Sequence, residues 1–115
     1  MIAVIFEVLP SAAGRPAYLE QAARLKPMLE QMDGLVSVER FQSLSNPDKL
    51  LSLSFWRDEE AVRGWREHGE HRITQAAGRA GIFDNYRLRV AAVLRDYGMF
   101  ERAEAPPYHL PVQQP

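Results

Sequence analysis

Residues 50–65, LLSLSFWRDEEAVRGW, pass from a strand pattern to a helix pattern within a few positions. Large apolar side chains first recur at every second residue, which is the period of a β-strand: Leu51, Leu53 and Phe55. Asp58 then suits the N-cap of a helix, because its carboxylate can accept a hydrogen bond from a backbone N–H of the first turn. The segment therefore predicts a strand followed at once by a helix, and this helix carries Trp65.

Three other segments have the composition of β-strands. Residues 2–9 are rich in β-branched and aromatic types and are apolar on both faces. Residues 35–43 lead through the turn-forming residues 45–48 into residues 50–56, so we expect these two strands to form a hairpin. Residues 86–97 alternate apolar side chains with polar or small ones and complete a set of four strands.

Two amphipathic helices are expected between the strands. Over residues 17–32 the apolar side chains recur at steps of three and four, which is the spacing of one helical face. Pro27 lacks a backbone N–H and crowds the preceding turn, so we expect a kink or a restart near Lys26. The second helix should be interrupted at Gly69 and continue over residues 70–80.

The resulting order, β-α-β-β-α-β, is typical of a ferredoxin-like split β-α-β fold of the α+β class. It predicts a four-stranded antiparallel sheet with both helices on one face. The other face would leave an apolar patch of roughly several hundred Å² in water, so we expect a homodimer that pairs through it. The domain should occupy residues 1–102, and the proline-rich residues 103–115 should form a tail without regular structure.

Composition argues against several classes of function. The 115 residues carry 14 basic and 15 acidic side chains, so a net charge of −1 gives no field that attracts nucleic acid or a membrane surface. The sequence has no cysteine, no pattern of a signal peptide and no apolar run near the roughly 18 residues of a membrane span, which favours a cytoplasmic protein. Its glycines form neither a dinucleotide fingerprint nor a P-loop.

Two histidines on the second helix superficially resemble a metal-binding pair. His68 and His71 stand three residues apart with glutamates beside them, but Gly69 removes the rigidity that such a site needs. No other ligand has an obvious reason to converge there. We therefore expect a solvated or pocket-edge turn and no metal.

The polar side of the last strand is basic. Its arginines are Arg87, Arg89 and Arg95. They could meet an anionic substrate, or they could pair across strands with acidic neighbours such as Glu39, and the pattern favours the second interpretation.

The segment SFWRDEEAVRGWREHGEHR at residues 54–72, together with YRLRV at 86–90 and RDY at 95–97, resembles the antibiotic biosynthesis monooxygenase family. The pattern W-R-D-E-E-A followed by W-x-x-H-x-x-H carries the resemblance, which covers roughly residues 1–100. It implies a dimeric α+β barrel, the assembly that strands with two apolar faces suggest on their own.

Two branches of this family differ in their site residues. The haem-degrading branch has an asparagine on the first strand, a tryptophan on the second helix and a histidine ten residues later, where this chain holds Glu7, Trp65 and Gln75. Glutamine does not serve as a haem-iron ligand, so haem degradation is not expected. The branch that oxygenates polycyclic phenols without a cofactor has an aromatic hydroxyl six residues after the tryptophan, where this chain has His71.

The resemblance thus implies a monooxygenase that acts on a small electron-rich aromatic molecule and needs no cofactor. His71 would transfer a proton, Trp65 would stack or donate its N–H, and Glu7 would be an inward carboxylate of raised pKa. Phe55 and Tyr86 would join Trp65 in holding the substrate, in a pocket between the helices and the sheet. The alternative is a dimeric protein of the same fold that binds a small molecule, or has a stress-associated role, without turnover.

Overall fold

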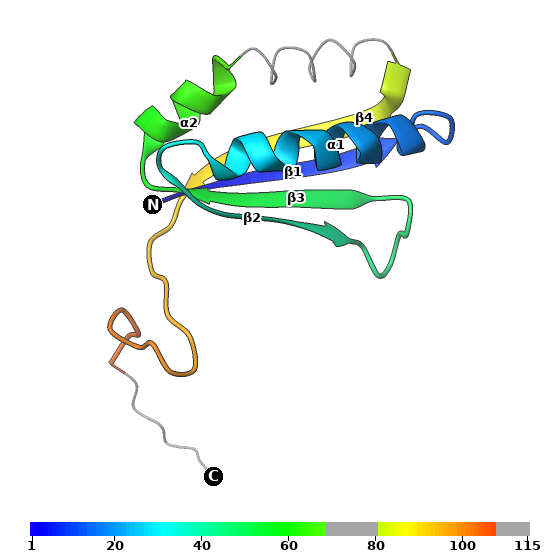
Figure 1. Ribbon diagram of the computed structural model, residues 1–115. Helices are drawn as coiled ribbons and strands as arrows, with labels where there is room; N and C mark the ends of the chain where they lie inside the picture. The colour runs from blue at the N-terminus through cyan, green and yellow to red at the C-terminus, as the bar shows by residue number, and fades with distance from the viewer. Residues whose placement is uncertain (69–80, 108–115) are drawn as a thin grey trace.

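Strands and helices follow one another in the order β1, α1, β2, β3, α2, β4 (Figure 1). The structure is a computed structural model and describes residues 1–68 and 81–107. The strands are Ile2–Pro10 (β1), Leu35–Gln42 (β2), Leu50–Trp56 (β3) and Phe83–Ala92 (β4). The helices are Arg15–Glu30 (α1) and Glu59–Arg66 (α2).

The sheet has the strand order β2-β3-β1-β4, and each pair of neighbouring strands is antiparallel. Both α1 and α2 lie over the same face of the sheet (Figure 1), which we call the helix side. The opposite face, over which no helix of the described residues lies, is the open face. The predicted split β-α-β fold is therefore confirmed, while the pairing of two copies into a dimeric barrel stays a prediction.

The core lies between the helices and the sheet. Val4, Trp56 and Val62 belong to one buried cluster, and Val8 and Tyr18 belong to a second cluster farther along the sheet. Trp56 is fully buried, and its indole Nε1 donates a hydrogen bond to the Ser54 hydroxyl at 2.9 Å. The one polar atom of the ring is thereby satisfied, so burial of this large side chain leaves no unpaired donor.

Helix α1 runs through Pro27 without a break, so the expected restart near Lys26 is wrong. Pro27 and Ala23, whose carbonyl loses its helical partner, are both exposed, so water can satisfy this carbonyl. Tyr18 and Leu29 on the opposite side of the helix are buried and hold it against the sheet. Packing therefore outweighs the local effect of the proline.

Helix α2 begins as predicted. The Asp58 carboxylate accepts a hydrogen bond from the backbone N–H of Ala61 at 2.9 Å, which confirms its role as N-cap. The Arg57 guanidinium contacts both Asp58 at 3.2 Å and Asp33 at 3.1 Å, and these contacts lower the pKa of each carboxyl group. For Asp58 the larger cause of the lowered pKa is the hydrogen bond from Ala61.

Strand β4 covers Phe83–Ala92, whereas the alternating pattern predicted residues 86–97. It ends where its partner β1 begins, and the last contact is a hydrogen bond from the Val93 N–H to the Met1 carbonyl at 2.9 Å. The chain then leaves the sheet on the side away from the helices (Figure 1). We call residues 93–107 the arm.

Several predictions fall on parts of the chain that the structure does not describe. The interruption at Gly69, the helix over residues 70–80 and the last residues of the tail lie outside the described residues. Within the described residues, no helix is long and apolar enough to cross a membrane.

Candidate functional site

An aromatic cluster lies on the helix side, next to the start of α1. The Phe83 ring packs against Tyr18 with centroids 5.5 Å apart and against Phe6 and Tyr86 with centroids 6.0 Å apart. Phe6 and Tyr86 are in turn 5.7 Å apart. Tyr18 is buried while Tyr86 is 60% exposed, so the cluster reaches from the core to the surface.

Strand β4 extends this aromatic surface with an apolar strip. The register places Tyr86, Leu88 and Val90 opposite Val8, Phe6 and Val4, so all three lie on the helix side. They are 60%, 51% and 49% exposed, which is unusual for neighbouring large apolar residues on one strand. At about 3.3 Å per residue the strip is about 13 Å long, the length of a compound with several fused rings.

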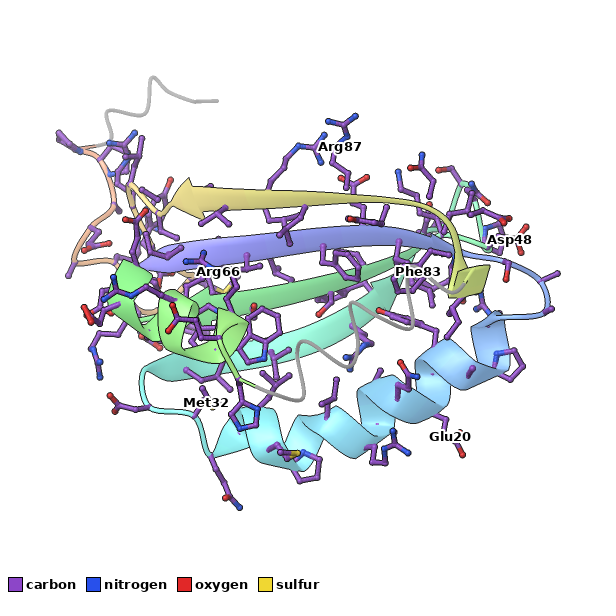
Figure 2. The ribbon with its side chains drawn as sticks, turned by 90° about the horizontal axis from the view of Figure 1, so that it is seen from above. Glu20, Met32, Asp48, Arg66, Phe83 and Arg87 are labelled. Atoms are coloured by element: carbon purple, nitrogen blue, oxygen red, sulfur yellow. The ribbon has the colours of Figure 1, made fainter. Side chains whose placement is uncertain are left out.

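Helix α2 borders the far end of the strip. A groove of about 390 Å³ separates the helix from β4 and is lined by Val62, Arg66 and Val90 together with exposed charged residues of α2. Figure 2 looks onto the helix side, where Phe83 lies near one end of the strip and Arg66 lies near the other end, beside the groove. The strip and the groove are a surface on which a flat apolar molecule can lie.

Trp65 of α2 stands next to this end of the sheet. Its ring stacks on Trp56 with centroids 5.7 Å apart and planes at 29°. Trp65 is half-buried and packs against the core cluster, so it has a structural role as well as a position suited to the site. Two of the predicted site residues, Trp65 and Tyr86, therefore lie on the helix side, at opposite ends of the apolar strip.

Glu7 does not join them. It lies on the open face, where its two carboxylate oxygens contact the Lys49 Nζ at 2.8 Å and the Arg89 guanidinium at 2.7 Å. Chiefly through the hydrogen bond from Lys49, these cations lower the pKa of Glu7. The expectation of an inward carboxylate with a raised pKa is therefore wrong.

The expected pairing of a β4 arginine with an acidic residue on another strand is confirmed for Arg89, although the partner is not Glu39. Arg89 pairs with Glu7 on the adjacent strand β1, whereas Glu39 lies on β2 at the other edge of the sheet. A groove of about 240 Å³ on this part of the sheet is lined by Glu7, Lys49, Arg87 and neighbouring residues. Figure 2 shows that Arg87 extends past the outer edge of β4, away from the helices.

Phe55 lies on the open face as well, because its neighbour Trp56 occupies the helix side. The structure thus separates Phe55 and Glu7 from Trp65 by the thickness of the sheet. His71 and Gln75 lie outside the described residues, so their positions stay predictions.

The residues that sequence reasoning missed are Phe6, Phe83 and Leu88. Phe6 and Leu88 could have been identified from the sequence, because each lies on the same face of its strand as a residue that was assigned to the core or to the site. Phe83 precedes the alternating pattern of its strand and gave no such signal. Among residues 1–68 and 81–107, no group of three or more His, Cys, Asp or Glu side chains could hold a metal ion.

Comparison with curated proteins identifies two relatives. The chain is 44% identical over 93 residues to a jasmonate monooxygenase of Pyricularia oryzae, a match that covers 81% of this chain and 43% of that protein. It is 30% identical over 93 residues to the protein YqjZ of Bacillus subtilis, covering 81% of this chain and 79% of that protein. The chain thus spans less than half of the length of the first relative.

Solved structures share the fold at low sequence identity. A protein of Deinococcus radiodurans described as an antibiotic biosynthesis monooxygenase has a TM-score of 0.78 at 13% identity, over 86% of this chain and 98% of that one. A Mycobacterium tuberculosis protein has a TM-score of 0.76 at 18% identity, over 84% and 98%. Residues 1–77 also match the family model described as antibiotic biosynthesis monooxygenase. The resemblance noted in the sequence is therefore confirmed, and the chain belongs to the antibiotic biosynthesis monooxygenase family.

Proposed function

We propose that the protein is a monooxygenase whose substrate is an electron-rich aromatic compound, such as a polycyclic phenol, bound on the helix side. The observation that carries the proposal is the half-exposed strip of Tyr86, Leu88 and Val90 between the aromatic cluster and α2. Membership of the family and the monooxygenase named among its relatives support the reaction type. The aromatic substrate is an inference from the chemistry of the surface.

The proposed reaction needs no metal, flavin or haem, because the substrate itself supplies the electrons. Oxidation of a ring CH₂ group to a carbonyl releases four electrons, and dioxygen takes up four as it becomes the carbonyl oxygen and one water. A base first removes the acidic proton, and the resulting carbanion combines with dioxygen to give a hydroperoxide after protonation. Loss of the second C–H proton together with hydroxide then forms the carbonyl and water.

The protein must therefore bind the ring system, exclude water around it and accept a proton. Phe6, Leu88 and Val90 offer apolar contacts, and the Tyr86 hydroxyl is available to donate a hydrogen bond to an oxygen of the substrate. Trp65 suits stacking at the other end of the strip. For the proton acceptor we retain His71, which rests on its spacing from Trp65 in the sequence.

The relative named for jasmonate suggests a second substrate class, an alicyclic keto acid. The two classes differ in electron count. Hydroxylation of an unactivated C–H group releases two electrons, so the reduction of dioxygen to the hydroxyl oxygen and water needs two more from an external reductant. Whether turnover requires a reductant therefore separates the two classes.

The test is oxygen uptake with an anthrone- or naphthol-type substrate in the presence of a chelator and without a reductant. For an anthrone-type substrate we expect one dioxygen consumed per carbonyl formed, and we expect His71→Ala to lower kcat by about 10² to 10⁴ if it transfers the proton. Binding of such compounds without uptake would favour the non-catalytic alternative. Uptake that appears only with jasmonate and a reductant would replace the aromatic substrate with the keto acid.

A further inference from the structure

Strand β2 carries an arginine with a buried polar atom that nothing in the described part of the chain satisfies. The Nε of Arg40 is buried and has no hydrogen-bond partner among residues 1–68 and 81–107. The Arg40 guanidinium also forms no ion pair with any of these residues. Native proteins satisfy the large majority of their buried polar groups, so an unpaired one needs a physical reason.

Other arginines of the chain show how a guanidinium is ordinarily paired. Arg57 contacts Asp33 at 3.1 Å, and the side chains of Arg57, Arg63 and Arg89 are all about half-exposed and all pair with carboxylates. Arg40 is more buried than these three and has no carboxylate beside it in the described residues. Because a charge is costly to remove from water without a partner, the position of Arg40 favours an anionic ligand.

The strand register places Arg40 on the helix side of the sheet. Arg40 of β2 pairs with Ser52 of β3, and Ser52 pairs in turn with Phe6 of β1. Phe6 then pairs with Leu88 of β4. Residues directly opposite one another on antiparallel strands project from the same face, so these four form one row across the helix side. Arg40 lies two strand spacings, about 9.6 Å, from Phe6 in this row.

Ser52 adds a second polar group between Arg40 and the apolar strip. Its side chain is half-buried, and its hydroxyl makes no hydrogen bond within residues 1–68 and 81–107. Ser54, two positions farther along the same face, differs because its hydroxyl accepts a hydrogen bond from the Trp56 Nε1 at 2.9 Å. Two polar side chains with unused donors therefore lie next to each other at the edge of the surface proposed to hold the substrate.

We propose that Arg40 binds the anionic oxygen of an ionised phenol or enol on the helix side, and that the Ser52 hydroxyl is a second donor to this oxygen. The inference rests on the monooxygenase function proposed above. When the base takes the acidic proton from a ring CH₂ group, the electron pair of the broken C–H bond forms a C=C bond and the carbonyl π pair moves to the oxygen. No electron passes to dioxygen in this step. A guanidinium beside the oxygen stabilises the resulting anion.

The row also defines the class of substrate. Rings that lie against Phe6 and Leu88 would direct an oxygen on their rim toward Ser52 and Arg40. Ring ketones of the anthrone type and naphthols have such an oxygen, and each becomes an oxyanion when it loses its acidic proton. A methyl ether of the same size cannot ionise, so Arg40 should contribute little to its binding.

The test measures the pH at which bound 2-naphthol ionises, followed by its absorbance with the protein in excess. In the wild type, bound naphthol should ionise at least about one pH unit below free naphthol, because the guanidinium favours the anion. In Arg40→Gln this difference should disappear. Arg24→Gln, at an exposed position of α1, removes the same charge and should behave as the wild type.

Binding of 2-methoxynaphthalene, measured by equilibrium dialysis, separates this inference from the proposed function. We expect the wild type and Arg40→Gln to bind this ether with equal affinity. If both proteins bind both compounds and ionise naphthol at the same pH, the role of Arg40 is overturned while the apolar site stands. If the wild type binds neither compound, the substrate site itself is contradicted, and this inference falls with it.

Urea denaturation of the ligand-free protein distinguishes a binding role of Arg40 from a structural one. Arg40→Met keeps an apolar stem and removes an unpaired buried group, so the midpoint of unfolding should stay the same or rise. In the same variant, kcat with an anthrone-type substrate should fall by about 10² to 10³, the usual effect of losing one oxyanion donor. A lower midpoint together with an unchanged kcat would assign Arg40 to folding and overturn the proposal.

Discussion

Trp65 stacks on Trp56 with ring centroids 5.7 Å apart and planes at 29°, and this contact attaches α2 to the fully buried centre of the core. Removal of the ring should therefore loosen the helix that borders the candidate site. For Trp65→Ala we expect a loss of about 1–3 kcal/mol in the free energy of unfolding, less than for a fully buried tryptophan because Trp65 is only half-buried. Urea denaturation followed by far-UV circular dichroism measures this change.

Trp65→Phe is the informative companion variant, because it keeps a ring for stacking and removes the indole N–H. Its loss of stability should be below about 1.5 kcal/mol. If Trp65→Ala is as stable as the wild type, the stack does not anchor α2.

The turn between α1 and β2 depends on a glycine. Gly34 has a φ of 87°, and a Cβ at this position would collide with the Cβ of Ala61 on α2. Gly34→Ala should therefore cost about 1–3 kcal/mol of stability. Gly64→Ala is the matched control, since Gly64 lies within α2 with open space around it and should gain about 0.5–1 kcal/mol. A neutral Gly34→Ala variant would contradict the close approach of the turn to α2.

Glu7 should make the stability of the fold depend on pH in the acid range. Lys49 and Arg89 lower the pKa of its carboxyl group from 4.5. A lowered pKa in the folded state gives a stabilisation that is present above the unfolded pKa and is lost as the pH falls through the folded pKa. The free energy of unfolding should therefore decrease below about pH 4.5, and Glu7→Gln should weaken this decrease.

Urea denaturation of both proteins between pH 3 and pH 7, a range of about four units around the carboxyl pKa values, measures the difference. Part of the decrease should persist in Glu7→Gln, because Asp33 and Asp58 also have a lowered pKa. Glu20→Gln on the exposed surface of α1 is the control and should behave as the wild type. Identical pH profiles for Glu7→Gln and the wild type would contradict the role of the two cations.

The sequence predicts the elements of this fold well because their signals are local. Asp58 identifies the start of α2 from the composition of a few neighbouring residues, and the strand order follows from the succession of elements. The effect of Pro27 was overestimated, because its exposure to water depends on how α1 packs.

The site was harder to predict because β1 is apolar on both faces. The alternation along β1 correctly places Glu7 and Phe6 on opposite faces of the sheet. The sequence does not say, however, whether the odd-numbered or the even-numbered residues of β1 face the helices. The partners of Glu7 come from the β2–β3 hairpin and from β4, and only the three-dimensional register brings them together. Phe55 was likewise predicted to join Trp65 in the site, but its neighbour Trp56 packs in the core on the helix side, and adjacent positions on a strand face opposite sides of the sheet.

The most direct test of a substrate site on the helix side compares oxygen uptake by two variant proteins. In each variant a glutamate replaces one exposed leucine. Leu88→Glu places a carboxylate in the middle of the helix-side strip, whereas Leu44→Glu places one at a fully exposed position of the hairpin. Both positions are exposed enough for the fold to persist, so the comparison reports on the surface itself. With an anthrone-type substrate, Leu88→Glu should lower kcat/KM at least about tenfold, because the ring system would have to lie against a charge, and Leu44→Glu should match the wild type. Equal activity in all three proteins would contradict a substrate site on the helix side.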